Sequence, residues 1–344
     1  MKSNALLLLA ALLPAPLAAE VPQIMVQARA ESAPIDGDAD DPAIWVNPAD
    51  PMKSLVLGTD KTKGLYVFDL AGQQVDFLPD GKLNNVDIRP FRLIGEDVWL
   101  ASAAERGAEK LVFWIIRADG SVTHASPFAF DGVPADMADG VEDIYGSALM
   151  RDPETGRVSA LVNYKSGHVI QWEVTEQNGE LALTYLRTLQ VPSQPEGMVS
   201  DDRTGLIYVG EEDAAIWQFP AWPEGGDTGK TVATVPSDCF PRDDIEGLSI
   251  YDGAEGHYLV VSSQGIHRAA IFDLADAQTP CVGLVGVVAG EIDGVTETDG
   301  LDVTAMPLGP DYPAGMLVMM DDQNEMFTTG FKYMSFADVL AGLK

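Results

Sequence analysis

Six segments of the chain carry an acidic residue beside a small or aliphatic residue, and they follow one another at intervals of 46 to 56 residues. Short apolar runs typical of strands lie between them, such as "LYVFDL", "LVFWII" and "YLVVSS", bounded by turn residues. A repeat of this length with four short strands per unit is typical of propeller blades. The chain is therefore predicted to be all-β and to form a six-bladed β-propeller, with two sandwich domains as the alternative. The six segments are "DDPAI" (Asp41), "NNVDI" (Asp87), "VEDIYG" (Asp143), "QPEGM" (Glu196), "DIEGL" (Glu246) and "TDGLD" (Asp299).

The repeated acidic residues predict a cation site. In a propeller the innermost strand of each blade lines a central channel, so residues at the start of these strands form a ring at one mouth. Crowded carboxylates repel each other and resist desolvation, and hard cations with oxygen ligands compensate for this. Calcium is favoured because the four histidines and two cysteines show no metal-ligand spacing. Basic residues within this framework, Lys61, Lys63, Arg106 and Lys165, could grip a polyanion together with calcium.

The net charge narrows the range of partners. The chain of 344 residues has a formal net charge of −32, which repels nucleic acids and anionic membranes. We therefore expect no nucleic-acid partner and no membrane partner. A monomer that binds a small polyanion is the expected state.

The N-terminus predicts export. Residues 1–19 contain one Lys, an apolar run and two small residues at Ala18 and Ala19, as in a cleavable secretory signal. The run is shorter than the roughly 20 apolar residues that a membrane span needs. We expect a signal peptide over 1–19, one domain over 20–344, and a secreted or periplasmic protein. An exported chain with two cysteines either pairs them or buries both, and both alternatives stay open for Cys239 and Cys281.

Longer motifs of the chain resemble those of the β-propeller phytases, in order, from about Glu31 to the C-terminus. The resemblance implies a six-bladed propeller that uses several calcium ions to hydrolyse phytate, myo-inositol hexakisphosphate, bound as its calcium complex, by attack of a metal-activated water. The motifs are "DADDPAIWVNP", "KLNNVDIR", "ALVNYKSGHVIQWEV", "SQPEGM", "EEDAAIW", "DIEGLSIY", "SSQG" and "TETDGLDV".

The resemblance also implies three sets of site residues. The catalytic rim that bridges calcium would be Asp40, Glu196, Glu212, Asp244, Glu246 and Asp299. The residues that hold phosphate oxygens would be Lys61, Arg106, Tyr145 and Lys165. Stability sites would be Glu31, Asp41, Asn84 and the Val86 carbonyl near one ion, and Asp293, Asp321 and Asn324 near another.

Two positions depart from the family pattern. Thr62 stands between Lys61 and Lys63 where the family usually has two adjacent lysines, so one phosphate contact is lost or displaced by a residue. Gln323 stands where an acidic ligand is common, which should weaken that stability site. The rival functions are a calcium-dependent lactonase or esterase on the same scaffold and a non-catalytic calcium-binding propeller.

Overall fold

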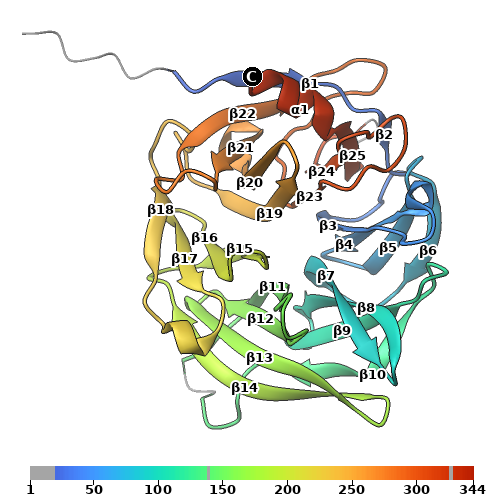
Figure 1. The fold of residues 1–344 in the computed structure, drawn as a ribbon, viewed down its shortest axis with the longest axis vertical. Coiled ribbons are helices and arrows are strands. Elements are labelled where there is room, and N and C mark those ends of the chain that lie inside the picture. Colours follow the sequence, from blue (N-terminus) through green and yellow to red (C-terminus); the bar gives the residue numbers. More distant parts are fainter. Residues whose placement is uncertain (1–19, 138–139, 325–327) are drawn as a thin grey trace, which may run out of the picture.

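Six small β-sheets stand around a central axis in the computed structural model, which describes residues 20–137, 140–324 and 328–344 (Figure 1). Each sheet consists mainly of consecutive antiparallel strands, so the structure confirms the six-bladed propeller and not the pair of sandwiches. The expected signal peptide, 1–19, lies outside the described residues, and the predicted domain boundary after it stays a prediction.

The strands repeat in the same radial order in every blade. The innermost strands are β3 (Ala39–Trp45), β7 (Leu83–Leu93), β11 (Ile144–Arg151), β15 (Pro195–Asp201), β19 (Ile245–Gly253) and β23 (Leu301–Thr304). The second strands are β4 (Leu55–Asp60), β8 (Glu96–Glu105), β12 (Val158–Tyr164), β16 (Leu206–Glu211), β20 (Gly256–Ser263) and β24 (Met316–Asp321). The third strands are β5 (Gly64–Asp69), β9 (Lys110–Ile116), β13 (His168–Gln177), β17 (Ala215–Pro220), β21 (Arg268–Asp273) and β25 (Gly330–Ser335). The fourth strands of the first five blades are β6 (Gln74–Leu78), β10 (Val122–Asp131), β14 (Glu180–Gln190), β18 (Lys230–Thr234) and β22 (Cys281–Val287).

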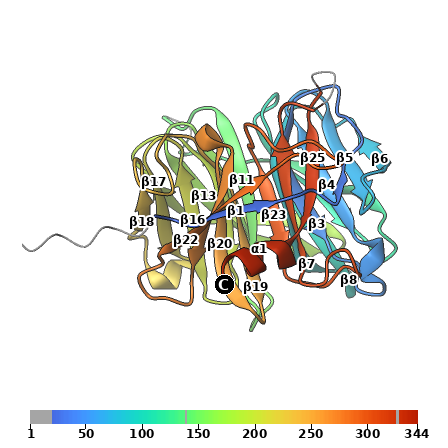
Figure 2. The ribbon, with the colours of Figure 1, turned by 90° about the horizontal axis from the view of Figure 1, so that it is seen from above.

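The N-terminal segment closes the ring between blades 5 and 6. Strand β1 (Gln23–Val26) adds to blade 5 by parallel pairing with β22, and β2 (Ala30–Glu31) completes blade 6 by pairing with β25. Figure 2 shows β1 passing across this junction next to the C-terminal helix α1 (Phe336–Gly342). The two ends of the chain therefore hold the last two blades together.

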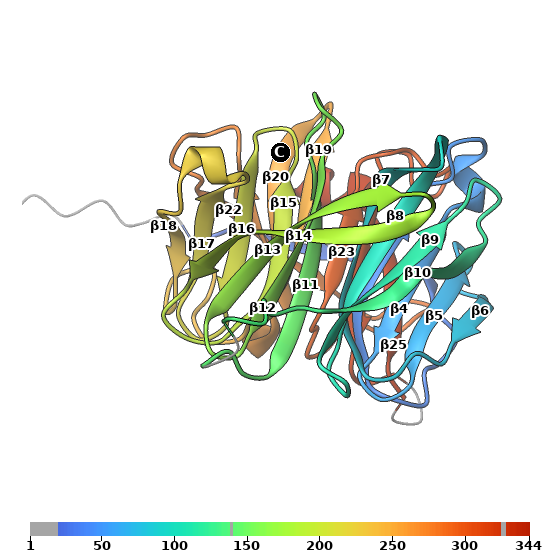
Figure 3. The same ribbon diagram turned by 90° about the horizontal axis from the view of Figure 1, so that it is seen from below.

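Apolar runs become strands that are buried on both faces, because each sheet lies between two neighbouring sheets. Strand β9, "KLVFWII", is buried at every position after Lys110. The fourth strands β6, β10, β14 and β18 are more exposed, as for β14 in Figure 3. Short 3₁₀ turns and helix α1 complete the described structure, and in that portion no helix is long and apolar enough to cross a membrane.

The innermost strands are irregular at the end that forms one mouth of the channel. In five of them the pairing register with the second strand shifts close to the strand start, as in a β-bulge. A side chain at Gly197 would collide with the Glu246 carbonyl of the next blade, and one at Gly247 with the backbone of Gly300. The glycine after the repeated acid is thus required by the close approach of neighbouring blades.

The two cysteines form a disulfide, which settles the alternatives that the sequence left open. Cys239 precedes β19, Cys281 begins β22, and their Cα atoms are 6.6 Å apart. The bond therefore ties the loop before the innermost strand of blade 5 to the outer part of the same blade.

Candidate active site

The ring at the mouth is acidic in four blades and neutral in two. Blades 4, 5 and 6 place Glu196, Glu246 and Asp299 directly before a glycine at or just before the start of the innermost strand, and blade 1 places Asp40 there. Blade 2 contributes the Asn84–Asn85 pair at this position, and blade 3 contributes Tyr145.

Three members of the predicted acidic ring are therefore not part of it, because in blade 1 this position belongs to Asp40 and not to Asp41. Asp87 lies further along β7, in a channel cavity of about 260 Å³, where it pairs with Arg89 and accepts the Leu149 backbone N–H at 2.8 Å. Asp143 is exposed and precedes β11. The prediction of six equivalent acids was wrong at these positions because each acid lies one to three residues away from the residue that faces the mouth, a displacement that the spacing of the repeats does not resolve.

Three carboxylates meet at the centre of the mouth. One oxygen each from Glu196, Glu212 and Glu246 lies within 4.8 Å of the other two. Burial, followed by the charge of Glu196, raises the pKa of Glu246 well above its usual value. Burial likewise raises the pKa of Glu212 to about 7. In the absence of a cation, these groups relieve their repulsion by binding protons.

Asp244 joins the three carboxylates from the loop before β19. Its backbone N–H donates to the Glu212 carbonyl at 3.2 Å, and burial raises the pKa of its carboxyl group. Its φ of 85° is in the left-handed region, which few non-glycine residues adopt. This backbone conformation, fixed on both sides by the loop and β19, aims a fourth carboxylate at the centre of the mouth.

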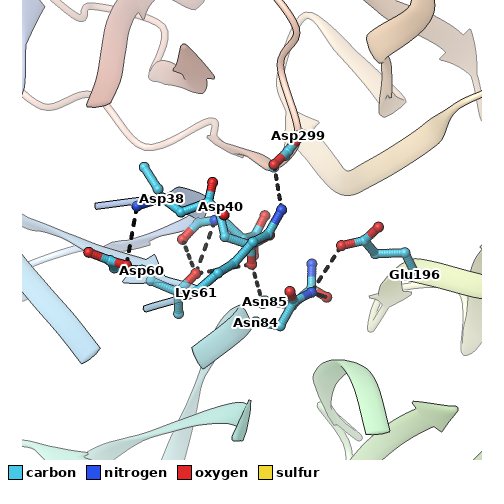
Figure 4. A network of polar contacts seen from close by, with 12 residues as sticks. Asp38, Asp40, Asp60, Lys61, Asn84, Asn85, Glu196 and Asp299 are labelled. Carbon is cyan, nitrogen blue, oxygen red and sulfur yellow. Dashed lines mark hydrogen bonds and ion pairs between the residues drawn. The ribbon is translucent and has the colours of Figure 1, made fainter. Parts of the chain in front are cut away.

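Lys61 neutralises the opposite part of the ring. Its ammonium lies 3.1 Å from Asp40 Oδ1 and 2.6 Å from Asp299 Oδ2, and Figure 4 shows this network. Gln264 also donates to Asp299 through its side-chain amide. Burial raises the pKa of Asp299 to about 7 in spite of the nearby lysine. Lys61, predicted to hold phosphate, is therefore an ion-pair partner of the carboxylates in this structure.

Two asparagines tie the blades of the mouth together. Asn84 is fully buried, and its amide donates to Glu196 Oε1 at 2.9 Å while its oxygen accepts from Arg106 at 3.2 Å. The backbone N–H of Asn85 donates to Asp40 Oδ2 at 2.6 Å (Figure 4). Asn84 therefore connects an arginine to the central carboxylates.

A cation pair lies beside the central carboxylates. The Arg106 guanidinium carbon is 5.0 Å from the centre of the Tyr145 ring, and the Lys165 ammonium is 4.2 Å from it. Tyr145 in turn adjoins Glu196, and burial followed by the charge of Glu196 raises the pKa of Tyr145. Three of the four predicted phosphate-holding residues are thus brought together, while Lys61 lies with the carboxylates of blades 1 and 6.

A second acidic cluster lies at the seam where the N-terminal segment closes the ring. The buried ammonium of Lys332 contacts Glu31 Oε2 at 2.6 Å, Asp321 Oδ2 at 3.6 Å, and Asp293. We call Glu31, Asp293, Asp321 and Lys332 the seam cluster. We call Asp40, Glu196, Glu212, Asp244, Glu246 and Asp299 the mouth cluster.

The structure groups the predicted stability residues differently from the sequence. Glu31 was expected beside Asp41 but lies with Asp293 and Asp321 in the seam cluster. Asp41 lies near Val86, whose N–H donates to Asp41 Oδ2 at 2.9 Å. Asn84 belongs to the mouth through its bond to Glu196.

Both clusters fit hard cations. In the mouth cluster, Glu196, Glu212 and Glu246 offer carboxylate oxygens within 4.8 Å of one another, and such oxygens are the ligands that calcium prefers. At the seam, Asn324 Oδ1 is a buried acceptor without a hydrogen-bond donor, and Asp321 Oδ2 has the Lys332 ammonium at 3.6 Å but no hydrogen bond. Buried acceptors are normally satisfied, so a bound cation would complete both residues.

Sequence reasoning missed three residues that belong to these clusters or contact them. Lys332 reads as an ordinary residue of the strand "GFKYMS", and only its position in a wholly apolar stretch could have marked it as a buried cation. Gln264 lies in the "SSQG" motif but had no assigned role. Asn85 contributes through its backbone, which side-chain patterns do not reveal.

Comparisons with known proteins agree with this architecture over almost the whole chain. A model of the phytase family matches residues 2–338. A 3-phytase of Bacillus subtilis (strain 168) is 37% identical over 325 residues, which cover 91% of this chain and 84% of that protein. The matched region includes all six blades and both acidic clusters.

Proposed function

Because the chain belongs to the phytase family, we propose that it is a calcium-dependent phosphomonoester hydrolase that releases phosphate from phytate. One observation carries the proposal: the cation pair of Arg106 and Lys165 adjoins a cluster of carboxylates at one mouth of the propeller. A highly charged phosphate ester needs both features, since the basic residues bind its oxygens and the carboxylates hold the cations that neutralise it.

The residues of the mouth have separate tasks in this proposal. Glu196, Glu212, Asp244 and Glu246 would hold calcium on one side, and Asp40 and Asp299 on the other. When bound, calcium neutralises charge on the transferred phosphoryl group and activates the attacking water. Arg106 and Lys165 would bind phosphate oxygens, and Asn84 orients Arg106 by accepting its N–H.

Lys61 links metal loading to substrate binding in this scheme. It now lies between Asp40 and Asp299, where a cation would compete with its ammonium. Loading of those carboxylates would release Lys61 toward the phosphate that the resemblance assigns to it. The Lys61 ammonium would thus neutralise the carboxylates before the cation binds and the substrate phosphate afterwards.

The test is phosphate release from phytate by the purified chain, with calcium and after chelation with EDTA. We expect release with calcium, none after chelation, and recovery when calcium is returned. A lactone and an aryl ester are assayed in parallel, because hydrolysis of these without release from phytate would assign the mouth to the rival lactonase or esterase reaction.

We also propose that the enzyme acts outside the cytoplasm after removal of residues 1–19. The apolar run with small residues at its end supports this, as does the disulfide, because such bonds persist in oxidising compartments. N-terminal sequencing of the chain recovered from the periplasm or the medium checks it. An intact Met1 in all fractions would contradict it.

A further inference from the structure

Tyr145 occupies, in blade 3, the position that blades 4 and 5 give to a carboxylate. It lies in the bulge at the start of β11 and precedes Gly146, as Glu196 and Glu246 precede Gly197 and Gly247. Strands β7 and β11 are neighbours in the ring (Figure 1). An aromatic ring is thus built into a wall that is otherwise made of acids and amides.

The ring of Tyr145 positions two cations that have no ion pair. Arg106 and Lys165 both lie over it, so their charges can be no further apart than the sum of their distances to its centre. Throughout the described residues, no carboxylate oxygen lies within 4.0 Å of either charge, although acidic side chains outnumber basic ones, 53 to 21. Attraction to the ring face offsets part of their mutual repulsion.

The hydroxyl of Tyr145 is committed elsewhere. It lies beside Glu196, whose charge, after burial, raises the pKa of Tyr145, so the hydroxyl keeps its one hydrogen and is placed to donate it to that carboxylate. Glu196 also accepts a hydrogen bond from Asn84, whose oxygen is bound to Arg106. The cation pair and the central carboxylates are therefore connected twice, once through Tyr145 and once through Asn84.

We propose that Tyr145 is a positioning residue with two separable roles: its ring holds Arg106 and Lys165 as a clamp for anionic groups, and its hydroxyl orients Glu196 for cation binding. This deepens the proposed function and rests on it. The resemblance assigned Tyr145 to a phosphate oxygen, whereas in the structure its hydroxyl lies beside Glu196. One side chain therefore sets the spacing between the anion clamp and the cation site.

The test compares Tyr145→Phe with Tyr145→Leu. The probe for the clamp is myo-inositol hexakissulfate, a sulfate ester that replaces phytate, measured by calorimetry on the calcium-loaded protein. The probe for the cation site is calcium itself, titrated without substrate. Tyr164→Phe is the matched control, because Tyr164 is a buried tyrosine of the same blade whose hydroxyl has no hydrogen-bond partner among the described atoms.

The two variants should separate the two roles. Tyr145→Phe keeps the ring, so hexakissulfate affinity should stay within about twofold of wild type, while calcium affinity at the mouth falls roughly tenfold, as for loss of a hydrogen bond to a charged group. Tyr145→Leu removes the ring as well, and hexakissulfate affinity should also fall roughly tenfold because two cation–ring contacts are lost. With phytate, KM should rise in the leucine variant and stay near wild type in the phenylalanine variant at saturating calcium. Tyr164→Phe should change none of these values.

Two outcomes would overturn the inference. If Tyr145→Phe weakens hexakissulfate binding as much as Tyr145→Leu does, the hydroxyl holds the anion directly. If neither variant changes either affinity while both keep the wild-type melting temperature, Tyr145 positions nothing. Failure of the proposed function would appear separately, as absence of phosphate release by the wild-type protein. The calcium and hexakissulfate binding measurements would still test the roles of Tyr145.

Discussion

The mouth cluster and the seam cluster contain the same chemical groups on differently connected parts of the chain. Each gathers aspartates and glutamates around one lysine, Lys61 at the mouth and Lys332 at the seam. The mouth residues lie at the start of the innermost strands of adjacent blades, in the loops just before those strands and, for Glu212, in the turn between β16 and β17. The seam residues come from both chain ends, since Glu31 and Lys332 are 301 residues apart.

Because the two clusters lie on differently connected parts of the chain, we expect their carboxylates to have different roles. A change of charge at the mouth leaves the blades paired, so it should alter binding and turnover with little effect on folding. A change at the seam acts where the ring is closed, so it should alter stability. The following predictions test that division, from the largest expected effect to the smallest.

Replacement of Glu246 by Gln should give the largest loss. The variant keeps the size of a buried side chain but removes a carboxylate from the central three, and turnover on phytate should fall on the order of 100-fold or more. Its melting temperature in calcium should stay close to wild type. Steady-state kinetics and calorimetry measure both, with Glu173→Gln, a surface partner of Arg157, as control. A loss below tenfold would remove Glu246 from the catalytic set.

Replacement of Asp321 by Asn should show the opposite behaviour. Ligands that bind only the folded state stabilise it, by about 2.7 kcal/mol at a concentration of 100 times Kd. We expect the rise in melting temperature caused by calcium to fall by more than half, while kcat stays within about threefold. Asp338→Asn, which removes an exposed pair with Arg29, is the control and should keep the full rise. An unchanged response to calcium would place the stabilising ion elsewhere.

The stability of the metal-free protein should depend on pH because of the buried carboxyl groups at the mouth. Burial raises the pKa of Asp299 and of Glu212 to about 7, so between pH 4 and 7 the folded state binds more protons than the unfolded state. Stability in EDTA should therefore fall as pH rises through this window, and calcium should reverse the trend. Thermal melts from pH 4 to 8 measure it, and Glu212→Gln should flatten the curve. A rise in stability with pH in EDTA would contradict the assignment.

Replacement of Lys63 by Ala should have the smallest effect. Its ammonium lies 3.5 Å from the exposed carboxylate of Asp36, and exposed pairs of this kind contribute little. Turnover should change less than about twofold, and the melting temperature should change by no more than about one or two degrees. Thr62→Lys, which restores the family's adjacent lysines, is the informative companion: a clear gain in phytate affinity there would show that the lost contact matters.

The fold could be predicted from the sequence because each sequence repeat corresponds to one blade. Short apolar runs at regular spacing fix the strand count, and the acid–glycine pairs at Glu196, Glu246 and Asp299 mark the close approach of inner strands. The same pattern was wrong at Asp41, Asp87 and Asp143. A bulge changes which residue faces the mouth, and spacing alone does not reveal a bulge.

The site could be predicted only in part. The resemblance named residues that the structure does bring together, such as Glu196, Glu212 and Glu246. It could not show that Glu31 meets Lys332, because that contact depends on how the two chain ends pair at the seam. It also could not show that Arg106 and Lys165 both lie over the ring of Tyr145, which follows from the geometry of neighbouring blades.

The pairing of the N-terminal segment with the last two blades has a consequence for how the protein folds. Strands β1 and β2 are made first, yet their partners β22 and β25 are made last, so ring closure must wait for nearly the whole chain. Contacts this distant in sequence form slowly, because the chain loses loop entropy before they stabilise it. Calcium at the seam should then act on the final step of folding. In refolding experiments, calcium added late should give the same yield of closed ring as calcium present from the start, and a lower yield after late addition would show an earlier requirement.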